Sequence, residues 1–269
     1  MHMEDNDELD DYIDKLINDE YIKLIEGDIG LSTCQLFKQN FSVTEPFASG
    51  VFIFWKDSFY LLTASHVIDN WSDANKLFVP INEGYIAIVG KGYGTEINNK
   101  KNIDVAYIKL KPELIPILTQ YYRFIPDIKI LNHKENIDGP SLCVFGYPTR
   151  NIRKESGKTY GSMYMTNLSK EKVYRYYDLS PISHYIVDFW GKKINIHTNK
   201  IEKPKIEHYG LSGCGLWYIS IDFDEETGEM ISDSTLIGIM TEFKRTKYDC
   251  LIGNRIEIII AAIEENECQ

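Results

Sequence analysis

The sequence predicts an all-β fold built from two packed antiparallel β-barrels. From Ser32 to about Gly146, short apolar runs alternate with turns rich in Asn, Gly and Asp, which is typical of barrel strands. A second series of strands is predicted from about residue 141 onward. The chain has 269 residues, 43% of them hydrophobic. A chain of this size buries about three-quarters of its unfolded surface, enough for one large core or two small ones.

Three segments are predicted along the chain. They are an N-terminal helical extension over 1–30, a first barrel over 31–140, and a second barrel with a C-terminal helix over 141–269. The extension is predicted from apolar residues that recur three and four positions apart up to Gly27: Leu9, Tyr12, Ile13, Leu16, Ile17, Tyr21, Leu24 and Ile25. A helix docked on the barrels is the favoured interpretation, and a partner-binding helix is the alternative.

Individual strands are expected where apolar runs end in turn residues. In the second half they are predicted at about 141–146, 160–167 and 184–190. In the first half, the glycine-rich stretch 90–94 has no helix after it, so a nucleotide-binding loop is not expected. A β-turn or bulge is the predicted structure there.

The composition excludes several classes of function. The chain has 40 acidic and 29 basic residues, a formal net charge of -11, so nucleic acid and anionic membranes are not expected as partners. No histidine has a His or Cys partner at metal-ligand spacing, and no Cys-x-x-Cys occurs. Neither a metal nor any other cofactor is therefore expected.

The five cysteines are odd in number and widely spaced, unlike the even sets of small secreted domains. The first residues are acidic and do not resemble a signal peptide, and no run of about 18 apolar residues occurs. A cytoplasmic location is therefore expected.

The segment Gly210-Leu211-Ser212-Gly213-Cys214-Gly215 reads as a nucleophile turn. Flanking glycines let a serine expose its hydroxyl on a tight turn, with backbone N–H groups directed at one point, as an acyl-transfer oxyanion requires. Upstream lie Thr63-Ala64-Ser65-His66 and Asp104-Val105-Ala106. This order predicts a catalytic triad of His66, Asp104 and Ser212.

In such a triad His66 takes the Ser212 proton as general base and later delivers it to the leaving amine. Asp104 fixes the imidazole tautomer and stabilises the imidazolium. An apolar strand runs into His66, and period-2 alternation predicts a strand that begins at Asp104. Taken singly, each residue also fits a structural role, as a core histidine, a turn aspartate or part of a glycine-rich loop. Their ordered combination favours the triad.

These motifs together resemble the trypsin-like (chymotrypsin-fold) serine peptidases, and more closely their cysteine-poor bacterial type than the secreted digestive enzymes. The resemblance runs from about Ser49 to the end of the chain. It includes residues 235–243, which resemble the family's substrate-binding strand, and residues 256–263, which resemble its closing C-terminal helix. It implies two barrels of the chymotrypsin type with the active site in the groove between them.

The resemblance implies roles for further residues. The backbone N–H groups of Gly210 and Ser212 are expected to form the oxyanion hole. Thr241, Glu242 and Phe243 are expected to form the strand that pairs with the substrate backbone, with Phe243 narrowing the mouth of the primary pocket.

Ile206 stands six residues before the nucleophile, at the position that lines the base of the family's primary pocket. Because Ile206 offers no countercharge to a buried cation, small or modest apolar side chains are expected at the cleaved residue. A shifted register is the alternative. It places Glu207 or Glu242 in the pocket and predicts cleavage after Lys or Arg.

Two residues of the turn depart from the family pattern. Leu211 replaces the acid that, in zymogen-activated members, pairs with a freshly cut amino terminus, so no such cut is expected here. Cys214 stands where the family usually has glycine. It is expected to pack as a small apolar group, and a role as alternative nucleophile is the less favoured interpretation.

Two functions are compatible with these features. The favoured one is an intracellular trypsin-like serine endopeptidase that cleaves protein or peptide substrates through an acyl-enzyme intermediate. The alternative is a catalytically silent trypsin-like pseudoenzyme that acts as a protein-binding module. The three intact triad residues favour the enzyme, and a regulatory protein partner is compatible with either.

Overall fold

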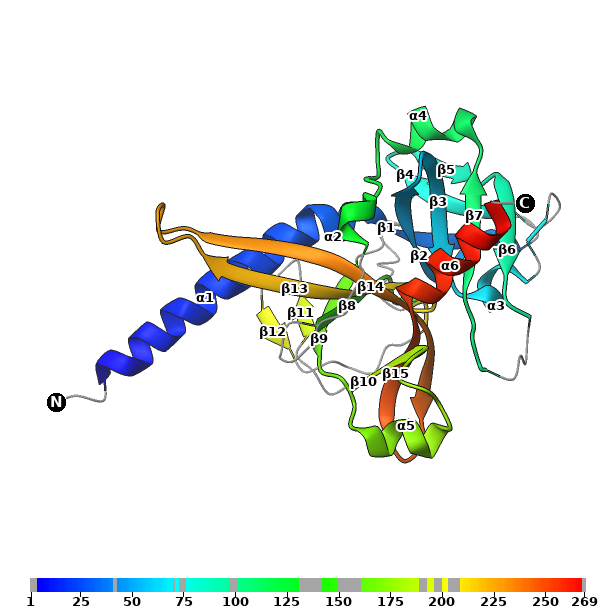
Figure 1. Ribbon diagram of the computed structural model, residues 1–269. Helices are drawn as coiled ribbons and strands as arrows, with labels where there is room; N and C mark the ends of the chain where they lie inside the picture. The colour runs from blue at the N-terminus through cyan, green and yellow to red at the C-terminus, as the bar shows by residue number, and fades with distance from the viewer. Residues whose placement is uncertain are drawn as a thin grey trace.

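The computed structural model describes residues 4–40, 43–69, 71–72, 76–96, 101–130, 142–149, 161–188, 193–195, 200–202 and 209–267, with only the backbone at 4–14, 40, 43, 193–195 and 200–202. Two curled antiparallel sheets form the body of the molecule, and helices lie at both ends of the chain (Figure 1). The predicted all-β fold of two packed barrels, with an N-terminal and a C-terminal helix, is confirmed.

The first sheet has the strand order β5-β4-β1-β2-β3-β7-β6 within the described residues. Each strand pairs antiparallel with its neighbours, and the long strand β2 is bent across the sheet between β1 and β3. The strands are β1 (Thr33–Asn40), β2 (Val43–Trp55), β3 (Ser58–Thr63), β4 (Leu77–Ile81), β5 (Gly84–Ala87), β6 (Gly90–Gly94) and β7 (Ala106–Leu110).

The second sheet has the order β10-β15-β14-β13-β8-β9-β11-β12 among the residues described. Its strands are β8 (Leu142–Gly146), β9 (Ser162–Thr166), β10 (His184–Asp188), β11 (Lys193–Asn195), β12 (Lys200–Glu202), β13 (Gly215–Phe223), β14 (Met230–Arg245) and β15 (Asp249–Arg255). Strands β8, β9 and β10 lie where the sequence predicted them. The division of the chain at residues 30 and 140 stays a prediction.

The helices are short except at the two ends of the chain. They are α1 (Glu4–Glu26), α2 (Asp28–Ser32), α3 (Ser65–Ile68), α4 (Ile115–Leu118), α5 (Glu171–Tyr177) and α6 (Ile256–Glu267), with 3-10 turns η1 (Pro112–Leu114) and η2 (Asp127–Lys129). None of the helices in the described part of the chain has the length and apolar character needed to cross a membrane.

One apolar core joins the two sheets. Its largest buried cluster takes Ile53 from the first sheet, Trp217 from the second and Ile259 from α6. The C-terminal end of α1 adds Leu24 and Ile25 to the same cluster, so this helix docks on the barrels as the sequence predicted. Burying such side chains contributes roughly 1.5–3 kcal/mol each, and this shared core fixes the sheets relative to each other.

Helix α1 continues beyond the barrels beside the long hairpin of β13 and β14 (Figure 1). The two are joined where Ser232 Oγ donates a hydrogen bond of 2.7 Å to Glu20 Oε2. Glu20 is only 5% exposed and also pairs with Lys23. The buried carboxylate is thus paired with a cation and a hydroxyl, which a charge removed from water requires.

The prediction of a turn or bulge at 90–94 is wrong, because this stretch is strand β6, paired with β7 along its length. The glycines serve close packing. A Cβ at Gly92 would lie 2.7 Å from the ring of Trp71, and one at Gly94 would lie 2.6 Å from Ser65 Oγ. Bare backbone here leaves room for the α3 segment that carries His66.

Candidate active site

His66 is the second residue of α3, which follows strand β3 after the single residue Ala64. The sequence predicted a position at a strand end, and the structure places it in a single helical turn that begins at Ser65. Ser65 Oγ donates a hydrogen bond of 2.7 Å to Thr95 O, which fastens this turn to the end of β6. The histidine is therefore presented by a short element that is tied to the sheet on both sides.

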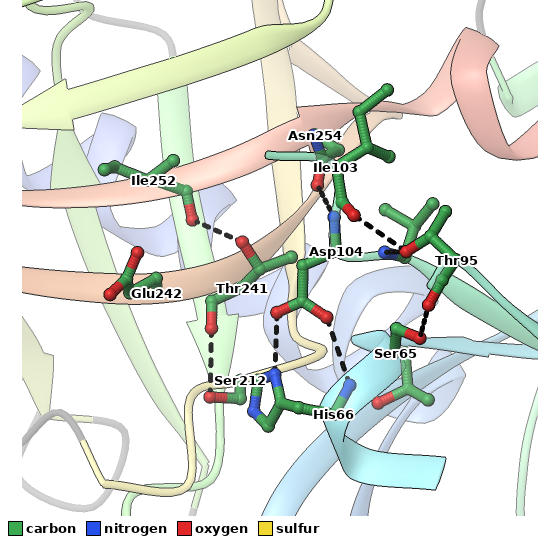
Figure 2. Close-up of polar contacts among 12 residues, drawn as sticks. Ser65, His66, Thr95, Ile103, Asp104, Ser212, Thr241, Glu242, Ile252 and Asn254 are labelled. Atoms are coloured by element: carbon green, nitrogen blue, oxygen red, sulfur yellow. Dashed lines mark hydrogen bonds and ion pairs between the residues drawn. The ribbon is translucent and has the colours of Figure 1, made fainter. Parts of the chain in front are cut away.

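His66 and Asp104 are joined by two hydrogen bonds (Figure 2). The Nδ1 atom of His66 lies 2.7 Å from Asp104 Oδ2, and the backbone N–H of His66 donates to Asp104 Oδ1 at 3.1 Å. Because an ionised carboxylate can only accept, Nδ1 carries the proton and Nε2 presents a lone pair. This is the tautomer that a general base needs.

The electrostatic surroundings of His66 are acidic. The hydrogen bond to Asp104 is the main cause that raises the pKa of His66 above its ordinary value, and partial burial opposes it. The charges of Asp104, Asp69 and Glu242 raise the pKa further. A raised pKa means that the imidazolium, which forms when the base accepts a proton, is stabilised at this position.

Asp104 is held from the second barrel by Asn254, a residue that the sequence analysis did not select. Asn254 lies on β15, is fully buried, and accepts the Asp104 backbone N–H through its Oδ1 at 3.0 Å. Nearby, His184 Nε2 lies 3.0 Å from Asn102 O, which anchors the same loop two residues earlier. Strand β7 begins two residues after Asp104, so these long-range bonds position the acid.

The Ser212 turn depends on two glycines in the left-handed region. Gly210 has φ +96° and Gly213 has φ +86°, conformations that side chains rarely adopt. A Cβ at Gly213 would lie 2.1 Å from both Ser49 O and Thr63 Oγ1. The turn therefore packs directly on the first barrel, against Thr63, which lies three residues before His66 in the chain.

Ser49 braces this turn from strand β2. Its backbone N–H donates to Ser212 O at 2.8 Å, and its hydroxyl donates to Gly210 O at 2.7 Å. The same hydroxyl accepts the N–H of Tyr147 at 3.0 Å, so this fully buried side chain is satisfied on both sides. Holding the Gly210 carbonyl on Ser49 fixes the orientation of the peptide unit between Gly210 and Leu211, just ahead of Ser212.

No described residue accepts a hydrogen bond from the backbone N–H of Gly210 or Ser212. These two groups are the ones that the sequence analysis assigned to the oxyanion hole. The residue between them, Leu211, is buried in an apolar cluster of the second sheet. Apolar packing, rather than a carboxylate, therefore holds the turn at this position.

The Ser212 hydroxyl donates a 3.2 Å hydrogen bond to Thr241 O, and no hydrogen bond joins it to His66. In the view of Figure 2 the His66 ring is drawn next to Ser212. The three predicted triad residues thus come to one site, with the His–Asp contact formed and the Ser–His contact not formed.

The predicted substrate-binding strand lies in β14. Thr241 Oγ1 donates to Ile252 O on β15 at 3.3 Å, whereas Glu242 is exposed and pairs with Lys244. Phe243 packs against the apolar cluster of the second sheet. Pairing of β14 with β13 ends at Ile239, so from Thr241 onward its described strand partner is β15 alone.

Two predicted pocket residues, Ile206 and Glu207, lie outside the described residues. Cys214 is fully buried in the same apolar cluster as Leu211, and burial raises the pKa of its thiol. A buried protonated thiol is a poor nucleophile. Within the described residues, no group of His, Cys, Asp and Glu side chains is arranged to hold a metal ion.

Comparison with known proteins supports the fold. No protein-family model and no curated protein matches the chain. The structure is similar to a solved structure described as "Structure of GrC", granzyme C, a serine protease. The match covers 88% of this chain and 94% of the other, with a TM-score of 0.53 and 12% sequence identity. At this identity the likeness concerns the fold, and the chain has a two-barrel, chymotrypsin-like fold.

Proposed function

We propose that this chain is a serine endopeptidase with His66 as general base, Asp104 as its orienting acid and Ser212 as nucleophile. The single observation that carries the proposal is the His66–Asp104 pair, joined by two hydrogen bonds, beside a glycine turn that presents Ser212. A purely structural role does not require an oriented His–Asp pair next to a serine on a glycine turn. The protease-like fold around it supports a protein or peptide as substrate.

In the proposed reaction the Ser212 hydroxyl rotates away from Thr241 O toward His66 Nε2. Nε2 takes the hydroxyl proton while Oγ attacks the scissile carbonyl carbon, and the carbonyl becomes a tetrahedral oxyanion. The imidazolium then protonates the leaving amine, and the acyl group stays on Ser212. A water molecule, deprotonated by the same His66, releases the acyl group and regenerates the serine.

The oxyanion is proposed to be stabilised by the N–H groups of Gly210 and Ser212. Removing one such donor typically reduces kcat by about 10²–10³-fold, so a turn held in register matters as much as the nucleophile. The bond from Ser49 to Gly210 O supports this assignment because it fixes the direction of the adjoining peptide group.

For the substrate, we propose that residues 241–243 of β14 offer a backbone edge beside the nucleophile. This role is supported because the pairing of β14 with β13 ends before Thr241. Ile206 at the pocket base and a preference for small or apolar residues at the cleavage point remain predictions, with Glu207 and Glu242 as the acidic alternatives. Cleavage profiling on a peptide library separates the two: dominant cutting after Lys or Arg would reject the apolar pocket.

A cytoplasmic site of action is part of the proposal. The described cysteines Cys34, Cys143, Cys214 and Cys250 are all free and buried, which is compatible with a reducing compartment.

A second candidate is a pseudoenzyme that uses the groove only to bind protein. The observation that favours it is the Ser212 hydroxyl bonded to Thr241 O instead of His66. Catalytic hydrogen bonds are often long or misaligned without substrate, so this geometry is compatible with both candidates.

Labelling by a fluorophosphonate probe tests the choice. An active triad is expected to give a single adduct on Ser212, located by peptide mass spectrometry, and His66→Ala is expected to abolish it. Cys214→Ser should label normally, since Cys214 is buried. A folded chain that remains unlabelled and hydrolyses no peptide would reject the enzyme in favour of the binding module.

A further inference from the structure

A cavity outside the catalytic groove lies between α6, η2 and the end of β2. It has a volume of about 720 Å³, and none of the three triad residues lines it. This volume falls in the range of roughly 300–1,000 Å³ that is typical of ligand sites. The lining residues are Trp55, Asp127, Ile128, Ile130, Ile256, Glu257, Ile260, Ala261 and Glu264.

The lining combines an apolar wall with negative charge. Trp55, Ile130 and Ile260 supply apolar surface, and Ile128 is 86% exposed at this site. Asp127, Glu257 and Glu264 are acidic, and no Lys, Arg or His is among the described lining residues. An occupant with an apolar group and a positive charge therefore complements the cavity.

Two side-chain atoms of the lining residues are buried without a hydrogen-bond partner among the residues that the structure describes. They are the indole Nε1 of Trp55, a donor, and Oε2 of Glu257, an acceptor. Orphaned buried groups of this kind are unfavourable unless a ligand or water completes them. An occupant with a cationic N–H donor complements the charge of Glu257, and a peptide with an arginine or lysine side chain next to an apolar residue matches both the acidic groups and the apolar wall.

The rim already accommodates one cation from the chain itself. Lys56 pairs with Glu264, and its Nζ lies 6.0 Å from the centroid of the Trp55 ring. Two further acidic residues, Asp127 and Glu257, also line the cavity. Glu257 pairs with Arg255 only through Oε1, at 3.9 Å, so this long ion pair compensates the Glu257 charge only in part.

We propose that this cavity binds a peptide segment of a partner protein that presents an arginine or lysine next to an apolar residue. The proposal goes beyond the peptidase activity and does not depend on it. The cavity is nevertheless close in sequence to the catalytic site, because Ile256 and Glu257 follow Asn254, whose side chain holds Asp104.

The test uses the Ser212→Ala chain, so that no probe is cleaved, with the peptide acetyl-Leu-Arg-Leu-amide and its matched control acetyl-Leu-Glu-Leu-amide. Binding is followed by the NMR resonance of the Trp55 indole N–H, assigned by its loss in Trp55→Phe. The arginine peptide is expected to shift this resonance saturably, and the glutamate peptide is not. Equal shifts with both peptides, or none with either, would overturn the proposal.

The variant Glu257→Gln tests whether the negative charge of Glu257 contributes to peptide binding. It is expected to raise the Kd of the arginine peptide at least about tenfold, because hydrogen bonds to charged groups contribute roughly 1.5–3 kcal/mol. Glu265→Gln, an exposed acid on the same helix outside the cavity, is the control and should leave Kd unchanged. An unchanged Kd in Glu257→Gln would contradict the site. Fluorophosphonate labelling of the unmutated chain reports separately on the proposed peptidase, so either idea can fail alone.

Discussion

The two halves of the candidate active site differ in how far they are assembled. The His66–Asp104 half is complete, with two hydrogen bonds between the residues. The Ser212 half has its turn in place, but its hydroxyl is bonded to Thr241 O. The His66–Asp104 contact is therefore formed, whereas in the proposed mechanism the Ser212 hydroxyl has to rotate toward His66.

A second contrast lies in what braces each half. Asp104 belongs to the first barrel and is held by Asn254 of the second, whereas the Ser212 turn belongs to the second barrel and is held by Ser49 of the first. Each barrel thus positions the residue that the other barrel contributes to the candidate site. Alignment of the site therefore depends on how the two barrels pack against each other. A variant that weakens the contact between the barrels is expected to disturb both halves of the site.

The largest expected effect comes from breaking either half outright. Replacing Ser212, His66 or Asp104 by Ala should lower kcat on the order of 10⁴ to 10⁶-fold, with little further loss in the triple variant, since the three act as a unit. Peptide hydrolysis under saturating substrate measures this. Losses that add across the three variants would show that the halves do not cooperate.

The next effect tests the contact of the Ser212 turn with the first barrel. Gly213→Ala places a Cβ against the Ser49 backbone at a φ of +86°, whereas Gly228→Ala, at a φ of +73°, meets nothing within 4 Å. The conformation alone costs about 1–3 kcal/mol in either variant. Urea unfolding should show a larger loss for Gly213→Ala, together with lost activity. Equal losses would mean that the turn yields and the brace is weak.

The two braces can be removed one at a time. Asn254→Leu leaves the Asp104 N–H without its acceptor, and Ser49→Ala leaves Gly210 O without its donor. Each change should lower kcat about 10 to 100-fold, as expected for an unsatisfied buried group that costs roughly 1–3 kcal/mol. Only Asn254→Leu should also move the pH profile, because it acts through Asp104 on His66. The same profile shift in both variants would remove the distinction between the braces.

The pH dependence of the His66–Asp104 half follows from the sign of the pKa shift. Activity needs neutral His66, so kcat/KM should rise with pH through the His66 pKa, which lies above the ordinary value of 6.5. Glu242→Gln removes one charge that raises this pKa, so its acid limb should move to lower pH. Glu226→Gln, an exposed change on the distant hairpin, is the control. A midpoint below 6.5 in the unmutated chain would contradict the pairing.

The smallest effect on activity is expected at Cys214. Cys214→Ser should retain hydrolysis within a few-fold and lower the unfolding free energy by about 1–3 kcal/mol, because it buries a hydroxyl among apolar side chains. Activity and thermal unfolding measure the two quantities. Complete loss of activity in a folded Cys214→Ser chain, with activity retained in Ser212→Ala, would instead make Cys214 the nucleophile.

The sequence was sufficient to predict those elements that depend on residues close together in the chain. The alternation of short apolar runs predicted the strands, and the spacing of apolar residues predicted the N-terminal helix, because burial of one face imposes a period. The C-terminal helix was expected from the family resemblance alone. The turn around Ser212 was recognisable since only glycine adopts its φ values readily. The order of His66, Asp104 and Ser212 predicted that they would meet.

Only the tertiary structure decided how these residues are held. Asn254 lies 150 positions from Asp104 and Ser49 lies 161 positions from Gly210, and a hydrogen bond across such a distance leaves no local pattern. The same reason explains the error at 90–94, where Trp71 packs on Gly92 and Ser65 packs on Gly94 in a strand that pairs with β7. Periodicity and turn chemistry are properties of neighbours in the chain, so the sequence alone determined the elements and the chemistry they carry. Their mutual support depends on groups that only folding brings into contact.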